Sequence, residues 1–263
     1  MSIDHRLRFL LDELRLVRTA RGVTQDDLAR MINWSPSTVA MVETGARKPP
    51  PGFWALVDKA LQTGGTFERL ATELGTPQWK IEWGSAEAGA AVLRSYQPLV
   101  VPGLLQTEAY ARAVLGDAGL LRREDVARHL AERMRRQEIL TRDNPPQLFA
   151  VLDEGVLRRP VGGPTVMREQ LHALVKAAEE PHIWVHVVPL SVGAYPGLNG
   201  PFVVALDPGG RATGYLDNQI QGDVVDDAEE VATIQLVWEA VRGQALPQQQ
   251  STDLILKVAE TWT

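Results

Sequence analysis

A short predicted helix from Pro36 to Glu43 has small or flexible residues on one side. Its outward residues are Ser37, Thr38, Ala40 and Met41, with Ser35 and Pro36 at its start. A surface of this kind suits the major groove of DNA, which admits a helix whose outer side chains are not bulky. Two basic residues, Arg47 and Lys48, follow the helix, and basic side chains bind backbone phosphates. The stretch therefore predicts a DNA-binding helix.

The element that positions this helix is a preceding helix predicted to start at Gln25. Thr24 stands at its N-cap, and Asp26 and Asp27 in the first turn favour the positive end of the helix dipole. One buried face is formed by Leu28, Ala29 and Ile32. Asn33 then interrupts the periodicity, so a turn is predicted there.

The second helix has its own start and stop signals. Ser35 is an N-cap residue, and Pro36 occupies the first helical position, where its missing N–H costs nothing. Gly45 ends the helix at a position that tolerates a left-handed conformation. The residues predicted to point inward are Trp34, Val39 and Val42. The two helices form a helix-turn-helix, and the alternative is a helical hairpin that does not contact DNA.

The pattern TQ-x-x-LA, followed by a turn, a helix and E-x-G-x-x-x-P, resembles the Xre family of lambda-repressor-like regulators. The resemblance implies that Gln25 anchors its helix to a phosphate and that Arg18 forms a structural ion pair with Glu43. It also implies a homodimer that binds double-stranded DNA at an inverted repeat. The predicted DNA-binding residues are Thr24, Gln25, Ser35, Pro36, Ser37, Thr38, Met41, Arg47 and Lys48.

The chain departs from the family in its recognition helix. Relatives often have Lys, Ser and Arg where this chain has Thr38, Ala40 and Met41. Each neutralised phosphate steepens the salt dependence of binding, so we expect weaker or less salt-sensitive binding. Arg47 and Lys48 are then expected to supply most of the backbone contact.

Length and charge divide the chain into two predicted domains, residues 1–76 and 77–263. Through Gln62 there are nine Lys and Arg against seven Asp and Glu, and the remainder has 18 against 26, which leaves only the first part mildly basic. The first part therefore suits DNA and the acidic part does not. The absence of cysteine excludes disulfides and a zinc finger. No apolar run is long enough for a membrane span, so a cytoplasmic protein without membrane contact is expected.

Helical patterns indicate that residues 1–76 form an all-α, five-helix, lambda-repressor-like domain. The second domain is predicted to be α+β with a small mixed or antiparallel sheet, because helices and Val-rich strands do not alternate regularly. Its predicted strands are 147–152, 183–190, 201–206 and 212–216, with a short extended stretch from Tyr96. Its predicted helices are 79–90, 125–140, 156–159, 165–178, 226–241 and 251–262, with a further amphipathic helix after the turn at Pro102 and Gly103. Within 125–140, Arg133, Arg135 and Arg136 are expected to face solvent.

Four separated motifs in the second domain carry another resemblance. They are PGLLQT-E-x-YARAV, the RxxRQ of Arg133 to Gln137, DEGVLRRPVGG from Asp153 and YPGLNGPFVV from Tyr195. These resemble the effector domain found behind an Xre domain in actinobacterial regulators described as Scr1-type and antitoxin-like. The resemblance implies a small partner protein encoded by the adjacent gene.

No residue constellation in the second domain predicts catalysis. His182 and His186 lie on a predicted strand, where the helical spacing of a zinc motif does not apply. Asp153 and Glu154 are better explained as capping residues of the helix that follows. We therefore expect no enzyme, cofactor or metal site. Two alternatives for this domain remain open: a module that binds a partner protein, and a small-molecule sensor with a pocket between sheet and helices. The 195–201 loop either lines a pocket or is a rigid turn between strands.

Overall fold

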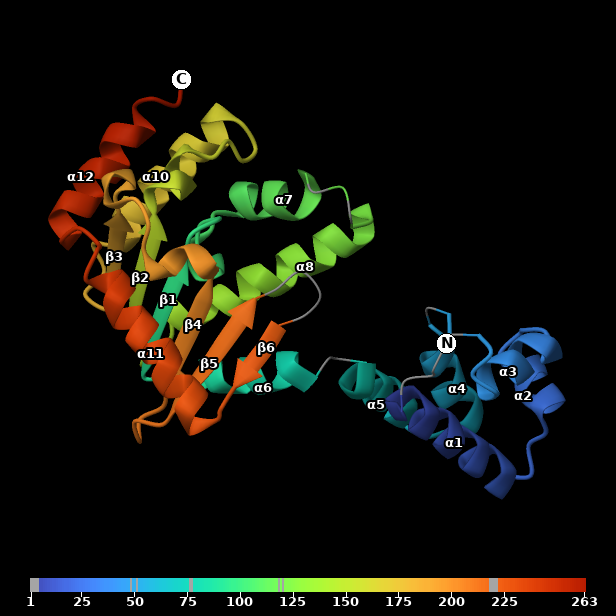
Figure 1. The fold of residues 1–263 in the computed structure, drawn as a ribbon. Coiled ribbons are helices and arrows are strands. Elements are labelled where there is room, and N and C mark those ends of the chain that lie inside the picture. Colours follow the sequence, from blue (N-terminus) through green and yellow to red (C-terminus); the bar gives the residue numbers. More distant parts are fainter. Residues whose placement is uncertain are drawn as a thin grey trace. The chain divides into compact units, whose positions relative to one another are not determined.

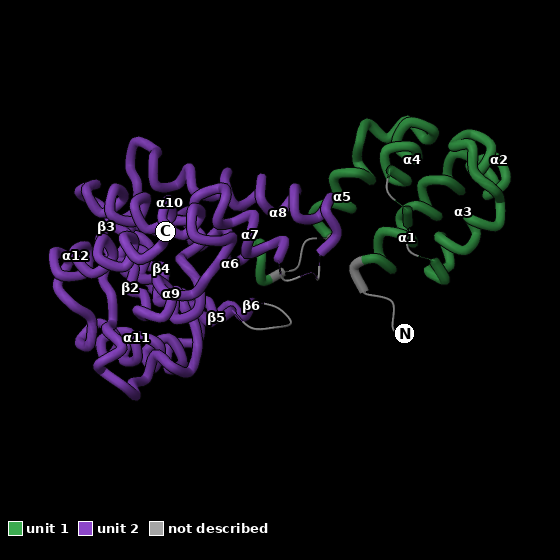
Figure 2. Tube along the Cα trace, turned by 90° about the horizontal axis from the view of Figure 1, so that it is seen from above, with its two compact units in different colours: residues 1–81 green, residues 82–263 purple. Residues whose placement is uncertain are grey.

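The computed structural model describes residues 5–47, 49–50, 52–75, 78–117, 119, 121–217 and 222–263. The chain forms two compact units, residues 1–81 and 82–263, which are coloured separately in Figure 2. The division falls within helix α6 (Gln78–Ala88). The boundary predicted after residue 76 falls outside the described residues.

Unit 1 is a five-helix bundle, as the sequence predicts. Its helices are α1 (His5–Ala20), α2 (Gln25–Met31), α3 (Pro36–Glu43), α4 (Phe53–Leu61) and α5 (Thr66–Gly75). Side chains from successive helices, among them Leu14, Leu28, Val39 and Phe53, are fully buried in one core. Burial of these apolar stripes is what stabilises helices that are individually too short to persist in water.

A buried carboxylate in α4 fixes the start of α5. Asp58 accepts hydrogen bonds from the backbone N–H groups of Phe67 at 2.9 Å and Glu68 at 2.8 Å, which lie in the first turn of α5. These N–H groups have no partner within their own helix, so the carboxylate satisfies them. Asp58 of α4 therefore caps α5, and the local sequence around Thr66 does not predict this cap.

Unit 2 is built on a six-stranded mixed sheet in the order β3-β2-β1-β4-β5-β6, shown in Figure 1. The strands are β1 (Val92–Gln97), β2 (Gln147–Asp153), β3 (Ile183–Val188), β4 (Phe202–Leu206), β5 (Ala212–Asp217) and β6 (Gly222–Val225). β1, β2 and β3 are parallel, whereas β4, β5 and β6 join by antiparallel pairing. The mixed sheet is confirmed.

The sequence prediction is incomplete at two strands. The extended stretch predicted from Tyr96 belongs to β1, which starts earlier and ends at Gln97. β6 is not predicted, because it has only four residues and includes Gly222 and Asp223, which are rare in strands. Pairing with β5 supplies what its local sequence lacks.

Helices cover both faces of the sheet. The remaining helices are α7 (Glu108–Asp117), α8 (Arg123–Arg136), α9 (Glu154–Arg158), α10 (Pro164–Ala177), α11 (Ala228–Arg242) and α12 (Gln248–Ala259), with short 3-10 turns η1 (Gly103–Leu105), η2 (Gln137–Leu140), η3 (Leu190–Val192) and η4 (Pro196–Asn199). In Figure 1, α11 crosses one face, where Trp238 and Val241 join a core with Tyr96. Side chains of α10 and α12 join the core on the opposite face. None of the helices in the described residues is long and apolar enough to cross a membrane.

Candidate nucleic-acid interface

The start of α2 is closed by a reciprocal cap. The Asp27 N–H donates to Thr24 Oγ1 at 3.1 Å, and the Thr24 N–H donates to Asp27 Oδ2 at 3.0 Å. Hydrogen bonds from the Thr24 side chain and backbone lower the pKa of Asp27 below its usual value. Two orphan N–H groups at the helix start are thereby satisfied. The cap occupies the Thr24 hydroxyl.

The turn between α2 and α3 uses a left-handed residue. Asn33 has φ 58°, a conformation that Asn tolerates better than most residues. The Trp34 N–H then donates to the carbonyl oxygen of Ala29 at 2.8 Å, which closes the turn. α3 begins at Pro36 with Ser35 as its N-cap, and Gly45 follows its end with φ 74°. The backbone thus follows the helix-turn-helix that the sequence predicts.

The hydroxyl groups at the start of α3 form one cluster. Ser35 Oγ accepts from the Thr38 N–H at 3.2 Å. The same oxygen lies 2.8 Å from Thr38 Oγ1 and 3.1 Å from Ser37 Oγ. Ser35 is therefore committed mainly to capping, whereas Ser37 is exposed and Thr38 is half-buried.

α3 separates its two sides cleanly. Its buried residues are Val39, Val42 and Glu43, and its exposed residues are Pro36, Ser37 and Met41. Met41 is 41% exposed and is the large apolar side chain on the exposed side of α3. The exposed face of α3 is therefore uncharged, and the rest of unit 1 leaves it uncovered.

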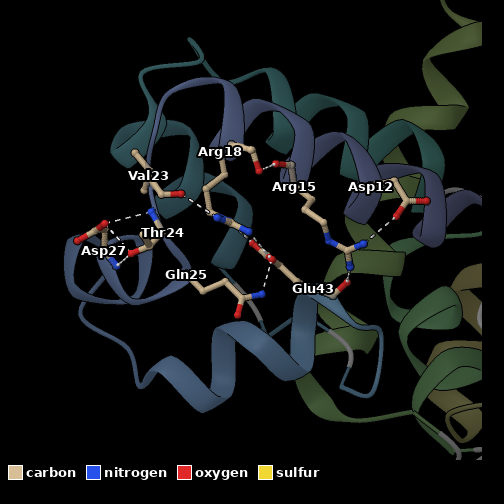
Figure 3. A network of polar contacts seen from close by, with 9 residues as sticks. Asp12, Arg15, Arg18, Val23, Thr24, Gln25, Asp27 and Glu43 are labelled. Atoms are coloured by element: carbon tan, nitrogen blue, oxygen red, sulfur yellow. Dashed lines mark hydrogen bonds and ion pairs between the residues drawn. The ribbon is translucent and has the colours of Figure 1, made fainter.

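Figure 3 shows the polar network that holds α3 against α1. Arg18 Nε lies 2.7 Å from Glu43 Oε1, and Arg18 Nη2 lies 3.0 Å from Glu43 Oε2. Arg18 is 9% exposed and Glu43 is 1% exposed, so the pair is buried. The third guanidinium nitrogen of Arg18, Nη1, donates to the Val23 carbonyl oxygen at 2.7 Å. The structural ion pair implied by the family resemblance is present.

Two further residues complete this network, and sequence reasoning did not identify their roles. Gln25 Nε2 donates to Glu43 Oε2 at 2.7 Å, so the start of α2 is tied to the end of α3. Arg15 Nη2 donates to the Glu43 carbonyl oxygen at 2.8 Å. Arg15 lies one turn before Arg18 on α1, and this helical spacing was the available signal.

The remaining predicted DNA-binding residues that the structure describes lie after the end of α3 and at the start of α2. Arg47 is exposed, and its backbone N–H donates to the Met41 carbonyl oxygen at 3.0 Å, which fixes its backbone beside the helix end. Lys48 lies outside the described residues. Gln25 and Thr24 stand at the start of α2, with Thr24 exposed and Gln25 half-buried.

Three arginines of α8 were expected to face solvent; Arg135 and Arg136 are exposed, whereas Arg133 is half-buried. Arg136 forms a two-pronged ion pair with Glu87 of α6, with Arg136 Nη2 2.6 Å from Glu87 Oε1. Arg133 Nη1 donates to Gln106 Oε1 at 2.7 Å. Glu87 and Gln106 are each 4% exposed, so burying their polar groups requires these partners. Arg135 remains exposed, as expected.

Asp153 takes part in a cap and in a tyrosine network. Its Oδ1 accepts from the Gly155 N–H at 2.7 Å, which confirms the predicted capping role at α9. Its Oδ2 accepts from Tyr195 Oη at 2.6 Å, and Tyr195 Oη lies 2.6 Å from Tyr96 Oη. Burial raises the pKa of Tyr96 to about 12 and raises that of Tyr195 as well. The 195–201 loop is thus tied to β1 and β2.

The two histidines on β3 and before it bind backbone carbonyl oxygens. His182 Nε2 lies 3.0 Å from the Leu140 oxygen, and His186 Nδ1 lies 2.9 Å from the Leu246 oxygen. Within the part of the chain that is described, no group of three His, Cys, Asp or Glu side chains is placed to hold a metal ion.

Unit 2 contains a cavity of about 600 Å³ between η1, η2, α10 and the start of β3. Its apolar lining includes Leu104, Leu105, Leu140 and Ile183, each between 5% and 8% exposed. Arg142 and Lys176 are among its charged lining residues, together with Glu180. The 195–201 loop does not contribute to this lining, in contrast to the pocket considered from the sequence.

Residues 82–257 match a protein family described as a domain of unknown function, DUF5753. The chain belongs to the DUF5753 family. Residues 10–78 match a family described as a helix-turn-helix domain, which supports a DNA-binding regulator. No curated protein and no solved structure matches the chain.

The two family matches follow the two structural units. The helix-turn-helix match begins within α1 and includes α2 and α3 with their turn. The DUF5753 match begins at Glu82 in α6 and ends at Lys257 in α12, so it contains the whole described sheet and the cavity.

Proposed function

We propose that the chain is a sequence-specific transcriptional regulator of the Xre, lambda-repressor-like type, which binds an inverted repeat in double-stranded DNA as a homodimer. The observation that supports this most is α3: its outer face is exposed and uncharged, while Arg18 and Glu43 hold its inner face against α1. A rigidly held helix with an exposed face is what entry into the major groove requires.

The charges of the two units support DNA binding by unit 1. Residues 1–81 contain 11 Lys and Arg against 9 Asp and Glu, whereas residues 82–263 contain 16 against 24. Duplex DNA repels an acidic surface and attracts a basic one. DNA contact is therefore assigned to unit 1, with Arg47 as a phosphate-binding residue beside α3.

Footprinting with the full chain on the DNA upstream of its own gene tests this proposal. Two protected half-sites are expected on one face of the duplex, with centres about 34 Å apart, because two recognition helices of a dimer reach successive major grooves. Protection by Ser37→Glu should be lost, since a carboxylate would then face the phosphates. A uniform, sequence-independent pattern of protection, or none, would contradict the proposal.

We assign the DUF5753 domain to dimerisation and to binding of a small partner protein, in an Scr1-type, antitoxin-like arrangement. In support, three leucines of this unit are largely exposed: Leu236 at 73%, Leu198 at 60% and Leu190 at 57%. α11 and η4, which carry Leu236 and Leu198, contact each other. Exposed apolar side chains on adjoining elements favour a protein interface. Co-purification with the product of the adjacent gene checks this, and a partner that elutes separately argues against it.

The cavity favours a second role, which is sensing of a small molecule with an apolar body and an acidic group. Its lining includes three leucines, and its charged residues are the two cations Arg142 and Lys176 and the single carboxylate of Glu180. Within the described part of the chain, Arg142 binds backbone carbonyl oxygens, of which those of Asn144 and Ala88 are the closest. An anionic group at this rim would therefore find two cations.

Anilinonaphthalene sulfonate, an apolar dye with one anionic group, is a suitable probe for the cavity of the full chain. Its emission is expected to rise on binding and to fall to background with Ala173→Trp, which fills the cavity. Lys176→Ala should weaken binding about two- to fivefold, as expected for loss of an exposed ion pair. Ala240→Trp, on the exposed side of α11, is the matched control and should change nothing. Equal emission from both tryptophan variants would refute the site.

We further propose that neither unit is an enzyme and that neither requires a cofactor. The side chains considered for catalysis serve structural hydrogen bonds. Asp153 caps α9 and binds Tyr195, and Glu154 pairs with Arg158 at 2.7 Å. Turnover of any substrate by the purified chain would overturn this.

A further inference from the structure

The recognition helix lacks the side chains that usually read guanine and adenine. Between Ser35 and Thr44 there is no Arg, Lys, Asn or Gln. Those residues make the bidentate hydrogen bonds that distinguish G and A in the major groove. The charged residue of α3, Glu43, has a side chain that is 0% exposed and bound to Arg18. Base recognition by α3 must therefore use hydroxyl groups and apolar contacts.

The hydroxyl groups give limited discrimination. Ser35 Oγ serves the helix cap, and Thr44 Oγ1 donates to the Ala40 carbonyl oxygen at 2.8 Å. Ser37 and Thr38 remain, and a hydroxyl group both donates and accepts hydrogen bonds. It therefore binds several base edges with similar strength, so these residues orient α3 more than they select a sequence.

The apolar groups on the same face are more selective. Met41 lies one helical turn after Ser37 and is 41% exposed, and Ala40 beside it is half-buried. Thymine is the base that presents a methyl group in the major groove of unmodified DNA, and apolar side chains contact it there. Burial of a methyl group against the flexible thioether of Met also suits an irregular surface.

We infer that this chain selects its DNA sites through the thymine methyl group, with Met41 as the main contact and Ala40 as its neighbour. Each half-site then contains a thymine at the position facing Met41. This inference rests on the proposed function, because it assumes that α3 enters the major groove. It adds the class of base that is read and the residue that reads it.

Selection of binding sites from a pool of random DNA duplexes by the full chain provides the test DNA. Each thymine of the selected sequence is then replaced singly by deoxyuridine, which lacks only the methyl group. At one position per half-site we expect about fourfold weaker binding, which corresponds to one methyl group removed from apolar contact. Other positions are expected to change little.

Met41→Ala identifies the residue. With this variant, the penalty for deoxyuridine at the sensitive position should disappear, because the methyl group has lost its partner. Met31→Ala is the matched control: Met31 is 53% exposed and belongs to α2, so the penalty should persist. Both side chains are exposed, and neither substitution removes a core contact.

The possible results are distinct. If no sequence is selected from the pool, the proposed function itself fails. If a sequence is selected but no deoxyuridine substitution weakens binding, the function stands and the thymine inference is wrong. If the penalty remains unchanged in Met41→Ala, the inference is wrong in its choice of residue and is likewise overturned.

Discussion

Glu43→Ala is expected to destabilise unit 1 by about 3–5 kcal/mol, the usual cost of removing one member of a buried ion pair. The side chain of Glu43 is fully buried and binds Arg18 through both carboxylate oxygens. Its removal leaves the guanidinium group of Arg18 buried without a countercharge. It also removes the acceptor of Gln25, so α1, α2 and α3 lose a shared contact.

Hydrogen exchange of the full chain, followed by mass spectrometry, measures this effect locally. Peptides from α1 and α3 should exchange much faster in Glu43→Ala, whereas peptides from the sheet of unit 2 should not. DNA binding should fall with the loss of α3 packing. Unchanged protection of α1 and α3 would show that the pair does not hold the helices together.

Two further variants separate the burial of the pair from its charge. Asp12→Ala removes the acidic partner of Arg15. The side chains of Asp12 and Arg15 are 57% and 47% exposed, so the loss should cost at most about 1 kcal/mol. Arg18→Met combined with Glu43→Leu replaces both charges with apolar groups. Such replacements are often neutral or stabilising, so the double variant should recover most of the lost stability.

Gly197→Ala is expected to destabilise unit 2 by about 3 kcal/mol, at the upper end of the range for overpacking. A Cβ at this position would lie 2.5 Å from both Tyr195 Cε2 and Tyr96 Cζ. Both rings are held by hydrogen bonds, Tyr195 to Asp153 and Tyr96 to Tyr195, so neither moves without losing one. Gly116→Ala, where a Cβ meets nothing within 4 Å, is the matched control and should not destabilise.

Ultraviolet titration of tyrosine gives a second readout of the same substitution. In the folded chain burial raises the pKa of Tyr96 and of Tyr215 to about 12, against about 10 in unfolded chains. The stability that the raised pKa values contribute is therefore fully present below about pH 10 and is lost as the pH rises towards 12. In Gly197→Ala, tyrosinate absorbance is expected to appear at lower pH than in the unaltered chain. Identical titration curves would show that the tyrosine network tolerates the added methyl group.

Much of unit 1 follows from local sequence signals. Thr24 and Ser35 cap α2 and α3, Pro36 starts α3 and Gly45 follows its end, as predicted. These signals act between residues that are close in the chain, so their physical effect does not depend on the rest of the fold. The same reasoning predicted the cap at Asp153, where donor and acceptor are two residues apart.

Predictions that depend on distant residues were less complete. Arg136 is exposed, as expected, but its ion pair with Glu87 was not predicted because Glu87 lies 49 residues earlier in the chain. β6 was missed because pairing with β5, and not its own composition, stabilises it. Asp58 caps α5 from α4, nine residues before the N–H group that it accepts from.

The sequence by itself determined that the first domain holds a helix-turn-helix whose second helix has an uncharged outer face, and that an α+β domain follows. Periodicity and capping residues suffice to locate these helices, because both signals lie within a few turns of chain, whereas burial in the core stabilises them. Only the tertiary structure decided that Gln25 joins the Arg18–Glu43 pair, that Gly197 packs under two tyrosine rings, and that η1, η2, α10 and β3 together line an open cavity. These features need contacts between segments that are far apart in the chain, and side-chain packing in three dimensions, not chain order, sets which segments meet.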